Sequence, residues 1–215
     1  MKNIAIFGAG GFGREVKMLI DHINAASPQW NFIGYFDDDF SKAILIDEQF
    51  RLGGTEALNA YHEKLYLVLA IGNPMVKRKI LHKIHNRNVH YPVLIHPNVV
   101  MGSSNVTIGD GSIICAGTIL TVDIKIGKHV ILNLACTVGH DTVIHDYCSF
   151  MPAVNISGEV TIEEAVYVGT GAKIINQLEI GEGTVVGAGA VVSKSLPPQC
   201  TAVGVPAKPI RFHSS

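Results

Sequence analysis

A histidine and an aspartate, His140 and Asp141, stand side by side in the segment CTVGHDTVIH (136–145). Imidazole takes up and releases protons near neutral pH, which makes histidine the most common general base in enzymes. A neighbouring carboxylate can orient the ring and raise its basicity. The pair is therefore a candidate for proton abstraction from an attacking amine or hydroxyl, provided that the imidazole faces outward and not into the core.

The surrounding sequence repeats every six residues, and this repeat predicts the direction of each side chain. Every sixth residue from Ile108 to Val192 is large and apolar, and the residue four places after each is small or aliphatic. A repeat of six is too short for a hairpin and predicts a parallel β-helix with three short strands in each coil of about 18 residues. A β-sandwich would instead have turns at irregular spacing. Glycine follows the first position of several hexads, as tight corners would require; these glycines are Gly109, Gly127, Gly139, Gly169, Gly181 and Gly187.

In this register the first and fifth positions of each hexad face inward, so His140, at the third position, lies at a corner and faces outward. A buried core histidine is not expected, and the alternative to catalysis is an exposed histidine without a role. Gly158 follows one coil later and has no side chain to block approach to its backbone N–H. A base beside an exposed amide suits acyl transfer from a thioester, because the amide can hold the developing oxyanion.

Residues 1–95 show a different pattern, in which strand-like and helix-like segments alternate. The strand-like segments are 3–7, 31–36 and 65–72, and the helix-like segments are 14–26 and 74–87. Such alternation favours a small parallel α/β sheet, one half of a Rossmann-like domain. We therefore expect an α/β domain over residues 1–95 and an all-β parallel β-helix with a C-terminal tail over residues 96–215.

The glycine-rich loop GAGGFG (8–13) follows the first strand and opens the first helix, and Asp37 lies 24 residues beyond Gly13. This is the dinucleotide-binding fingerprint, in which bare backbone N–H groups and a helix N-terminus face a phosphate. An NAD-dependent oxidoreductase is one interpretation. However, 95 residues supply only one mononucleotide-binding half, and no separate hydride-transfer domain follows. The diphosphate of a nucleotide sugar would fit the same loop.

Composition argues against several classes of protein. Charged residues make up only 16% of the 215 residues, the net charge is −1 and the basic residues are scattered, so nucleic acid is not the expected partner. No apolar run is long enough for a membrane span, and the N-terminus lacks the apolar core of a signal peptide. Four cysteines without C-x-x-C spacing suit the reducing cytoplasm. Histidines 82, 85, 90 and 96 have no accompanying carboxylate cluster, so no metal site is expected.

Three features together resemble a known class of enzymes: the hexad repeat, the GHD segment (139–141) and the closing GVPAKPIR (204–211). The repeat and tail resemble the left-handed β-helix of hexapeptide-repeat acyltransferases, and the whole chain is similar to the PglD/NeuD-like sugar acetyltransferases. The resemblance implies a homotrimer with active sites between subunits. It also implies acetyl-CoA as cosubstrate and a nucleotide-linked amino sugar, or sialic acid, as acceptor.

The resemblance further implies roles for individual residues. His140 would be the general base and Asp141 its partner, with Asn133 nearby. Coenzyme A would contact Ser149, Gly158, Gly169, Gly187 and Lys208. The nucleotide sugar would contact Gly8, Gly10, Gly11, Phe12 and Gly13 of the loop, Asp37 and Asp38 after the second strand, and Gly72 and Asn73 of the AIGN turn (70–73).

The chain departs from the family pattern at three of these positions. Asp141 replaces a glutamate that is one methylene longer, and Ser149 replaces a second histidine that contacts acetyl-CoA in the family. Phe12 replaces the histidine of a GHG loop and cannot donate its hydrogen bond, which points to a different sugar specificity.

From these observations we expect an acetyl-CoA-dependent acetyltransferase that acts on the amine of a UDP-4-amino sugar. Direct attack on the thioester is expected, because no cysteine shares the corner of His140. O-acetylation of a sugar such as sialic acid is the alternative within this class. The alternatives from other classes are the NAD-dependent oxidoreductase and a non-catalytic trimeric scaffold, since a fold does not determine a function.

Overall fold

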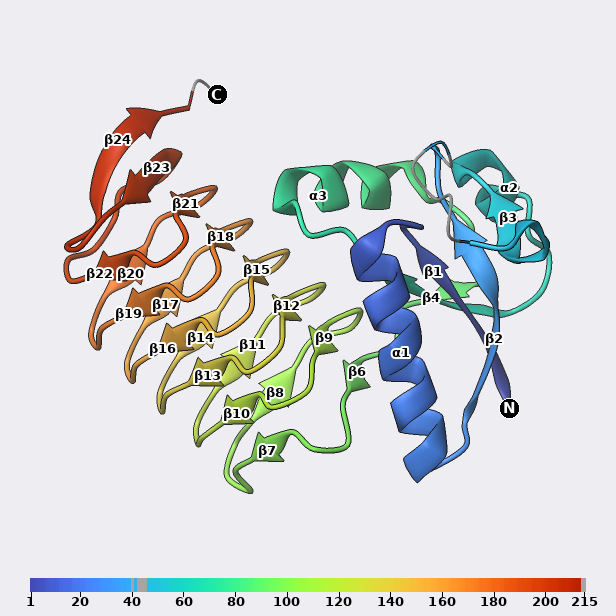
Figure 1. Ribbon diagram of the computed structural model, residues 1–215, viewed down its shortest axis with the longest axis horizontal. Coiled ribbons are helices and arrows are strands. Elements are labelled where there is room, and N and C mark those ends of the chain that lie inside the picture. Colours follow the sequence, from blue (N-terminus) through green and yellow to red (C-terminus); the bar gives the residue numbers. More distant parts are fainter. Residues whose placement is uncertain (40, 42–45, 214–215) are drawn as a thin grey trace.

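The computed structural model describes residues 1–39, 41 and 46–213, and it shows an α/β domain beside a long parallel β-helix (Figure 1). The α/β domain contains β1 (Lys2–Phe7), α1 (Gly11–Ala26), β2 (Trp30–Phe36), the 3-10 helix η2 (Glu48–Phe50), β3 (Arg51–Gly53), α2 (Thr55–Asn59), β4 (Leu65–Leu69), α3 (Pro74–Lys83) and β5 (Val89–His90). Its strands are parallel and lie in the order β3-β2-β1-β4-β5. The expected α/β sheet is confirmed.

Burial explains why these segments form a sheet covered by helices. The central strand β1 is a continuous apolar run, Ile4–Phe7, that is buried throughout, as in a parallel sheet covered on both faces. In α1 the buried side chains Val16, Leu19, Ile20 and Ile23 follow a helical spacing and form one apolar stripe.

Helix α3 starts where the sequence predicts and ends four residues earlier. Asn73 caps its N-terminus by accepting a hydrogen bond from Val76 N at 3.1 Å, and Pro74 occupies the first turn. At the other end, Asn59 of α2 donates to the Lys83 carbonyl and accepts from His85 N. These bonds to a distant side chain replace the helical pattern, so the helix stops at Lys83 and not near residue 87.

The β-helix consists of two-residue strands that repeat with the predicted period and a closing hairpin. The strands are β6 (Leu94–Ile95), β7 (Val100–Met101), β8 (Thr107–Ile108), β9 (Ile113–Ile114), β10 (Ile119–Leu120), β11 (Lys125–Ile126), β12 (Ile131–Leu132), β13 (Thr137–Val138), β14 (Val143–Ile144), β15 (Ser149–Phe150), β16 (Asn155–Ile156), β17 (Thr161–Ile162), β18 (Tyr167–Val168), β19 (Lys173–Ile174), β20 (Glu179–Ile180), β21 (Val185–Val186), β22 (Val191–Val192), β23 (Cys200–Val203) and β24 (Lys208–Phe212).

Three sheets form the three faces of a prism. The β6 sheet contains β6, β9, β12, β15, β18, β21, β23 and β24, the β7 sheet runs from β7 to β22, and the β8 sheet runs from β8 to β20. From β6 to β23 the strands pair in parallel with an offset of one coil, as Thr137 does with Asn155, and β24 pairs antiparallel with β23. The first strand, β6, falls inside the range of residues 1–95 that we expected for the α/β domain, yet it pairs with β9 of the prism.

Side-chain directions in the prism are as predicted. First-position residues from Ile114 to Val192 and fifth-position residues from Ser112 to Leu196 are buried, except Leu178, which is half-buried. The inward alternation therefore holds along almost the whole prism, and third positions such as His140 lie at its corners.

The glycines that follow the first position of several hexads have a different structural role from the tight corners that we expected. The left-handed backbone of each corner falls two residues later, at Ala135, Asp141 and Tyr147, for example. A Cβ on Gly139 would instead lie 2.5 Å from the backbone nitrogen of Gly158 on the next coil. These glycines are therefore needed for the close approach of neighbouring coils, and not for a left-handed turn.

The α/β domain docks on the β6 sheet through α1 and α3 (Figure 1). One apolar cluster joins Leu19 and Ile23 of α1 to Ile113 and Ile131 of the prism. Beside it, Lys77 of α3 is completely buried, and burial lowers the pKa of its amine to about 7.

The buried amine makes stability depend on pH in a defined direction. The unfolded chain keeps the Lys77 proton up to its ordinary pKa of 10.5, whereas the folded chain loses it near pH 7. The lysine therefore destabilises the folded chain by its full amount below pH 7, where it must be buried with its charge. This destabilisation decreases as the pH rises from 7 towards 10.5. Relative to Lys77→Met, the wild-type free energy of unfolding should rise by about 3 kcal/mol between pH 7 and 9.5 in urea titrations. Parallel pH curves for the two proteins would contradict this, and Lys79→Met, on the exposed side of α3, is the matched control.

Candidate active site

His140 and Asp141 lie at an outer corner of the prism, between β13 and β14. We call the stacked turns that join the β7 and β8 sheets the His140 corner (residues 121–124, 139–142, 157–160, 175–178 and 193–196). The side chains of His140 and Asp141 are 55% and 59% exposed, and His140 Nδ1 lies 2.8 Å from Asp141 Oδ2. Asp141 adopts the left-handed conformation, with φ of 56°, which aspartate tolerates. The carboxylate thus holds Nδ1 and leaves Nε2 for proton transfer.

Gly158 lies directly against the imidazole, one coil further on. A Cβ on Gly158 would be 2.5 Å from His140 Nε2, so only a glycine leaves room for the ring here. Its backbone N–H bonds to no protein acceptor in the part of the chain that the structure describes. However, Gly158 is buried because the ring covers it. Our expectation of an exposed amide is wrong for this conformation: the ring must move for the N–H to reach a ligand.

A second corner carries other predicted residues. We call the turns between the β6 and β7 sheets the Gly169 corner (residues 115–118, 133–136, 151–154, 169–172 and 187–190). Gly169 and Gly187 stack there, and a Cβ on Gly169 would lie 2.5 Å from Ala188 N. Asn133 belongs to this corner too; it is buried, and its Oδ1 accepts a hydrogen bond from Leu134 N at 2.7 Å. Within one chain Asn133 is therefore not beside His140, and its observed contact is that of a corner cap.

Ser149 is wrong as a direct coenzyme A contact in this arrangement. It lies on β15, is completely buried under α3, and its hydroxyl accepts a hydrogen bond from Lys77 Nζ at 3.0 Å. The resemblance implies a ligand-binding position here, but it does not reveal how α3 docks on the prism.

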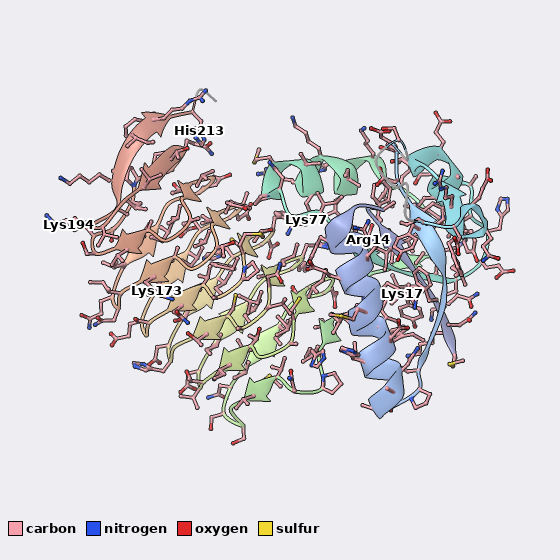
Figure 2. The ribbon with its side chains drawn as sticks, viewed as in Figure 1. Arg14, Lys17, Lys77, Lys173, Lys194 and His213 are labelled. Atoms are coloured by element: carbon pink, nitrogen blue, oxygen red, sulfur yellow. The ribbon has the colours of Figure 1, made fainter. Side chains whose placement is uncertain are left out.

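Two lysines lie near the end of the prism. Lys208 is exposed at the start of β24, as its expected role requires. Lys194 was not assigned a role from the sequence, yet it is exposed in the His140 corner, three coils beyond His140 (labelled in Figure 2). Counting in steps of 18 from His140 would have placed it there.

The glycine-rich loop forms one wall of a cleft of about 400 Å³ in the α/β domain. Gly8, Gly10, Gly11, Phe12, Asp37 and Gly72 line it, together with Asp39, Ala70 and Ile71. Gly13 is not part of the lining. A Cβ on this residue would overlap the Gly8 carbonyl oxygen, so a glycine is needed here for α1 to pack closely on the end of β1. The carboxylate of Asp37 accepts hydrogen bonds from Ala9 N at 2.7 Å and Asp39 N at 2.9 Å, so it also holds the loop in place.

Asp38 and Asn73 lie outside this cleft, contrary to our expectation. Asp38 accepts hydrogen bonds from the backbone and hydroxyl of Thr55, at 2.7 and 2.8 Å, and lines a neighbouring cleft with Lys83. Asn73 caps α3 and lines a third cleft, with Met75 and Tyr167 of β18. Both side chains are used to hold the local structure, which sequence spacing alone did not reveal.

The two halves of the predicted site face different corners of one chain. A Cβ on Gly72 of the loop cleft would be 3.9 Å from Met151, which belongs to the Gly169 corner, whereas His140 lies at the other corner of the β7 sheet. Within one chain, the glycine-loop cleft and His140 therefore lie at different corners of the prism.

Other kinds of site find no support in the described part of the chain. Across residues 1–39, 41 and 46–213, no three His, Cys, Asp or Glu side chains are grouped so that they could hold a metal ion. None of the helices formed by these residues has the length and apolar character to cross a membrane.

Comparison with known proteins agrees with the architecture. The chain matches the PglD N-terminal domain over residues 3–84 and the bacterial transferase hexapeptide (six repeats) over residues 159–194. The GDP-perosamine N-acetyltransferase of Escherichia coli O157:H7 is 31% identical over 189 residues, which cover 88% of this chain and 85% of that protein. This chain belongs to the PglD-like sugar acetyltransferase family.

Solved structures of relatives extend this likeness to the whole chain. PerB from Caulobacter crescentus, in complex with CoA and GDP-perosamine, has a TM-score of 0.84 and 30% identity, and the match covers 97% of each chain. WeeI from Acinetobacter baumannii AYE has a TM-score of 0.85 and 33% identity, and the match covers 98% of this chain and all of WeeI. The predicted left-handed β-helix and acyltransferase class are confirmed, so the oxidoreductase and scaffold interpretations are set aside.

The contact between His140 and Gly158 predicts the effect of adding one methyl group. In Gly158→Ala the new Cβ would push the imidazole out of its observed position and would also crowd the space in front of the Gly158 N–H, so turnover should fall by about 100-fold. The melting temperature should change little, because the displaced ring is already exposed. Steady-state kinetics and thermal unfolding measure the two effects.

The matched control is Gly117→Ala, at a left-handed corner position where Ala135 and Ala153 already stand on the following coils. It should retain wild-type turnover. Turnover of Gly158→Ala within twofold of wild type would contradict the proposed geometry.

Proposed function

We propose that this enzyme transfers the acetyl group of acetyl-CoA to the amine of a nucleotide-linked amino sugar. The observation that carries the proposal is the exposed His140–Asp141 pair on a hexapeptide prism, in a chain whose α/β domain carries a glycine-loop cleft. Relatives support both substrates: one is named as a GDP-perosamine N-acetyltransferase, and PerB was solved with CoA and GDP-perosamine.

The chemistry follows from the geometry of the pair. His140 Nε2 takes a proton from the amine as the nitrogen attacks the thioester carbonyl, and Asp141 stabilises the imidazolium that forms. The C–S bond then breaks, and the imidazolium returns the proton to the leaving coenzyme A sulfur. Once the ring has moved off Gly158, the free N–H of this glycine is placed to hold the oxyanion.

Direct attack on the thioester is favoured over a cysteine-bound intermediate. All four cysteines are buried and free, and they are Cys115, Cys136, Cys148 and Cys200. Burial raises the pKa of Cys136 to about 11 and that of Cys148 to about 12, which disfavours the nucleophilic thiolate. Free buried thiols also suit the cytoplasm, where we propose that the enzyme acts.

The expected homotrimer would bring the two corners together. Val100 and Ile119 project from the first coils of the β7 sheet and are 61% and 40% exposed, and Val122 and Leu134 flank them at the two corners. An apolar face of this kind is typical of an interface between subunits. In the trimer, coenzyme A would lie between the His140 corner of one subunit, with Gly158 and Lys194, and the Gly169 corner of the next. Lys208 and Lys194 would meet its phosphates.

The nucleotide sugar would place its diphosphate on the glycine loop and the N-terminus of α1. Phe12 would then lie beside the sugar or base and set specificity through its apolar ring. We retain the UDP-4-amino sugar as the acceptor predicted from the sequence. Because two relatives are named for GDP-perosamine, GDP-linked amino sugars must be tested beside it.

A free-thiol assay with acetyl-CoA tests the proposal. The acceptor panel contains UDP-, dTDP- and GDP-linked amino sugars and free sialic acid. Thiol release with one nucleotide-linked amino sugar, and an amide in the product, is the expected result. An ester product would instead support O-acetylation, and thiol release with no member of the panel would contradict the proposed acceptor class.

Replacing the base tests the mechanism in the same assay. His140→Ala should lower kcat by about 10²- to 10⁴-fold, because proton abstraction is lost, while the oligomeric state stays that of the wild type. The control His85→Ala changes an exposed histidine of the α/β domain and should behave as wild type. If kcat of His140→Ala remained within a few-fold of wild type, His140 would not be the base.

A further inference from the structure

Lys77 departs from the usual rules of burial more than any other charged residue described. It is 1% exposed, although lysine is almost never fully buried without a charged partner. Its side chain points from α3 towards the prism (Figure 2), where Nζ donates hydrogen bonds to Ser149 Oγ at 3.0 Å and to the Cys148 carbonyl oxygen at 3.4 Å. Both acceptors are neutral, and none of the ion pairs among residues 1–39, 41 and 46–213 includes Lys77.

The surroundings of the amine offer no electrostatic compensation. The Cys148 thiol is neutral because burial raises its pKa to about 12. Burial, followed by the charge of Lys77, lowers the pKa of nearby His129 to about 4, so this ring is neutral as well. An apolar side chain of similar length would fill the same space at a lower cost in free energy. The amine therefore does not serve to stabilise the fold. Its hydrogen bonds differ from apolar contacts in being directional, so they can fix the position of α3 on the prism.

The bonds of Lys77 join the α/β domain to the coil of the prism that carries His140. Lys77 lies one helical turn beyond Asn73, so a rigid piece of α3 connects its amine to the Ala70–Asn73 turn, whose Gly72 lines the glycine-loop cleft. Ser149 lies on the coil that carries His140, nine residues further along the chain. The amine thus connects the Ala70–Asn73 turn to the coil that carries His140, the proposed general base.

Apolar packing alone would leave the position of the α/β domain along the prism axis poorly defined. The contacts of α1 with Ile113 and Ile131 are non-directional, and the strands of the β6 sheet follow one another at a regular spacing. A slip by one coil would move the Ala70–Asn73 turn by about 4.8 Å along the prism. A misplacement of about 1 Å can already cost 100-fold in rate.

We propose that Lys77 is a positioning residue. Its hydrogen bonds to Ser149 and to the Cys148 carbonyl set the height of the glycine-loop cleft along the prism, and with it the placement of the acceptor amine relative to His140. This role rests on the proposed acetyl transfer to a nucleotide-linked sugar.

The test compares Lys77→Met with wild type, using acetyl-CoA and the nucleotide-linked amino sugar that wild type acetylates in the panel. The value of kcat/KM for the sugar should fall by about 10- to 100-fold. The KM for acetyl-CoA should stay within twofold, because the corners that bind it are unchanged, and the melting temperature at pH 7 should be equal or higher. A merely structural lysine would give the opposite pattern, a lower melting temperature with parallel losses for both substrates.

Two further variants keep the test decisive. Lys79→Met removes an exposed lysine from the same helix and should match wild type in every constant. Ser149→Ala removes one acceptor from the amine and should lower kcat/KM for the sugar in the same selective way, even if Lys77→Met fails to fold.

The outcomes separate this role from the proposed function. If wild type acetylates no sugar of the panel, the proposed function fails and the role of Lys77 falls with it. If wild type is active but Lys77→Met and Ser149→Ala keep its constants for the sugar, only the positioning role is contradicted.

Discussion

The stacking of one coil on the next is the constraint on which the rest of this structure depends. Between Thr107 and Val192 each strand pairs with the strand 18 residues away, so equivalent positions form straight columns along the prism. The columns leave no space for extra atoms at some corners, where the backbones of Gly139 and Gly158 approach closely. They also send first and fifth positions inward and third positions outward. The outward direction of His140, and the glycine beneath its ring, both follow from this register.

The proposed reaction needs both the glycine-loop cleft and His140, and a single chain keeps them apart. The cleft opens beside the Gly169 corner, whereas His140 and Asp141 lie at the His140 corner. The apolar cluster, the buried amine of Lys77 and the exposed Arg78–Glu182 pair hold the α/β domain on the prism, and we propose that the amine sets the position of the cleft along it. In this account, assembly of copies around an axis completes a site that each copy presents only in part.

The direction of side chains in the prism could be predicted from the sequence because a period of six has one physical interpretation. The burial of Ile114, Val138 and Ile156 and the exposure of His140 follow from it. Contacts between distant segments could not be predicted in this way. Ser149 was assigned to coenzyme A from a resemblance, but the docking of α3 covers it. Asp38 was assigned to the substrate, yet the short helix α2, for which the sequence shows no clear pattern, uses it as a hydrogen-bond acceptor. The rotamer that lays the imidazole over Gly158 was likewise beyond a register argument.

The most direct test of the account is complementation between two inactive variants. His140→Ala removes the base, and Gly10→Glu places a carboxylate at the phosphate-binding loop, where the structure has open space. If each site combines the cleft of one subunit with the His140 corner of another, trimers reassembled from an equal mixture should regain about a quarter of wild-type acetyl transfer. Mixtures no more active than either variant alone would show that one chain supplies the whole site, and the central claim would be wrong.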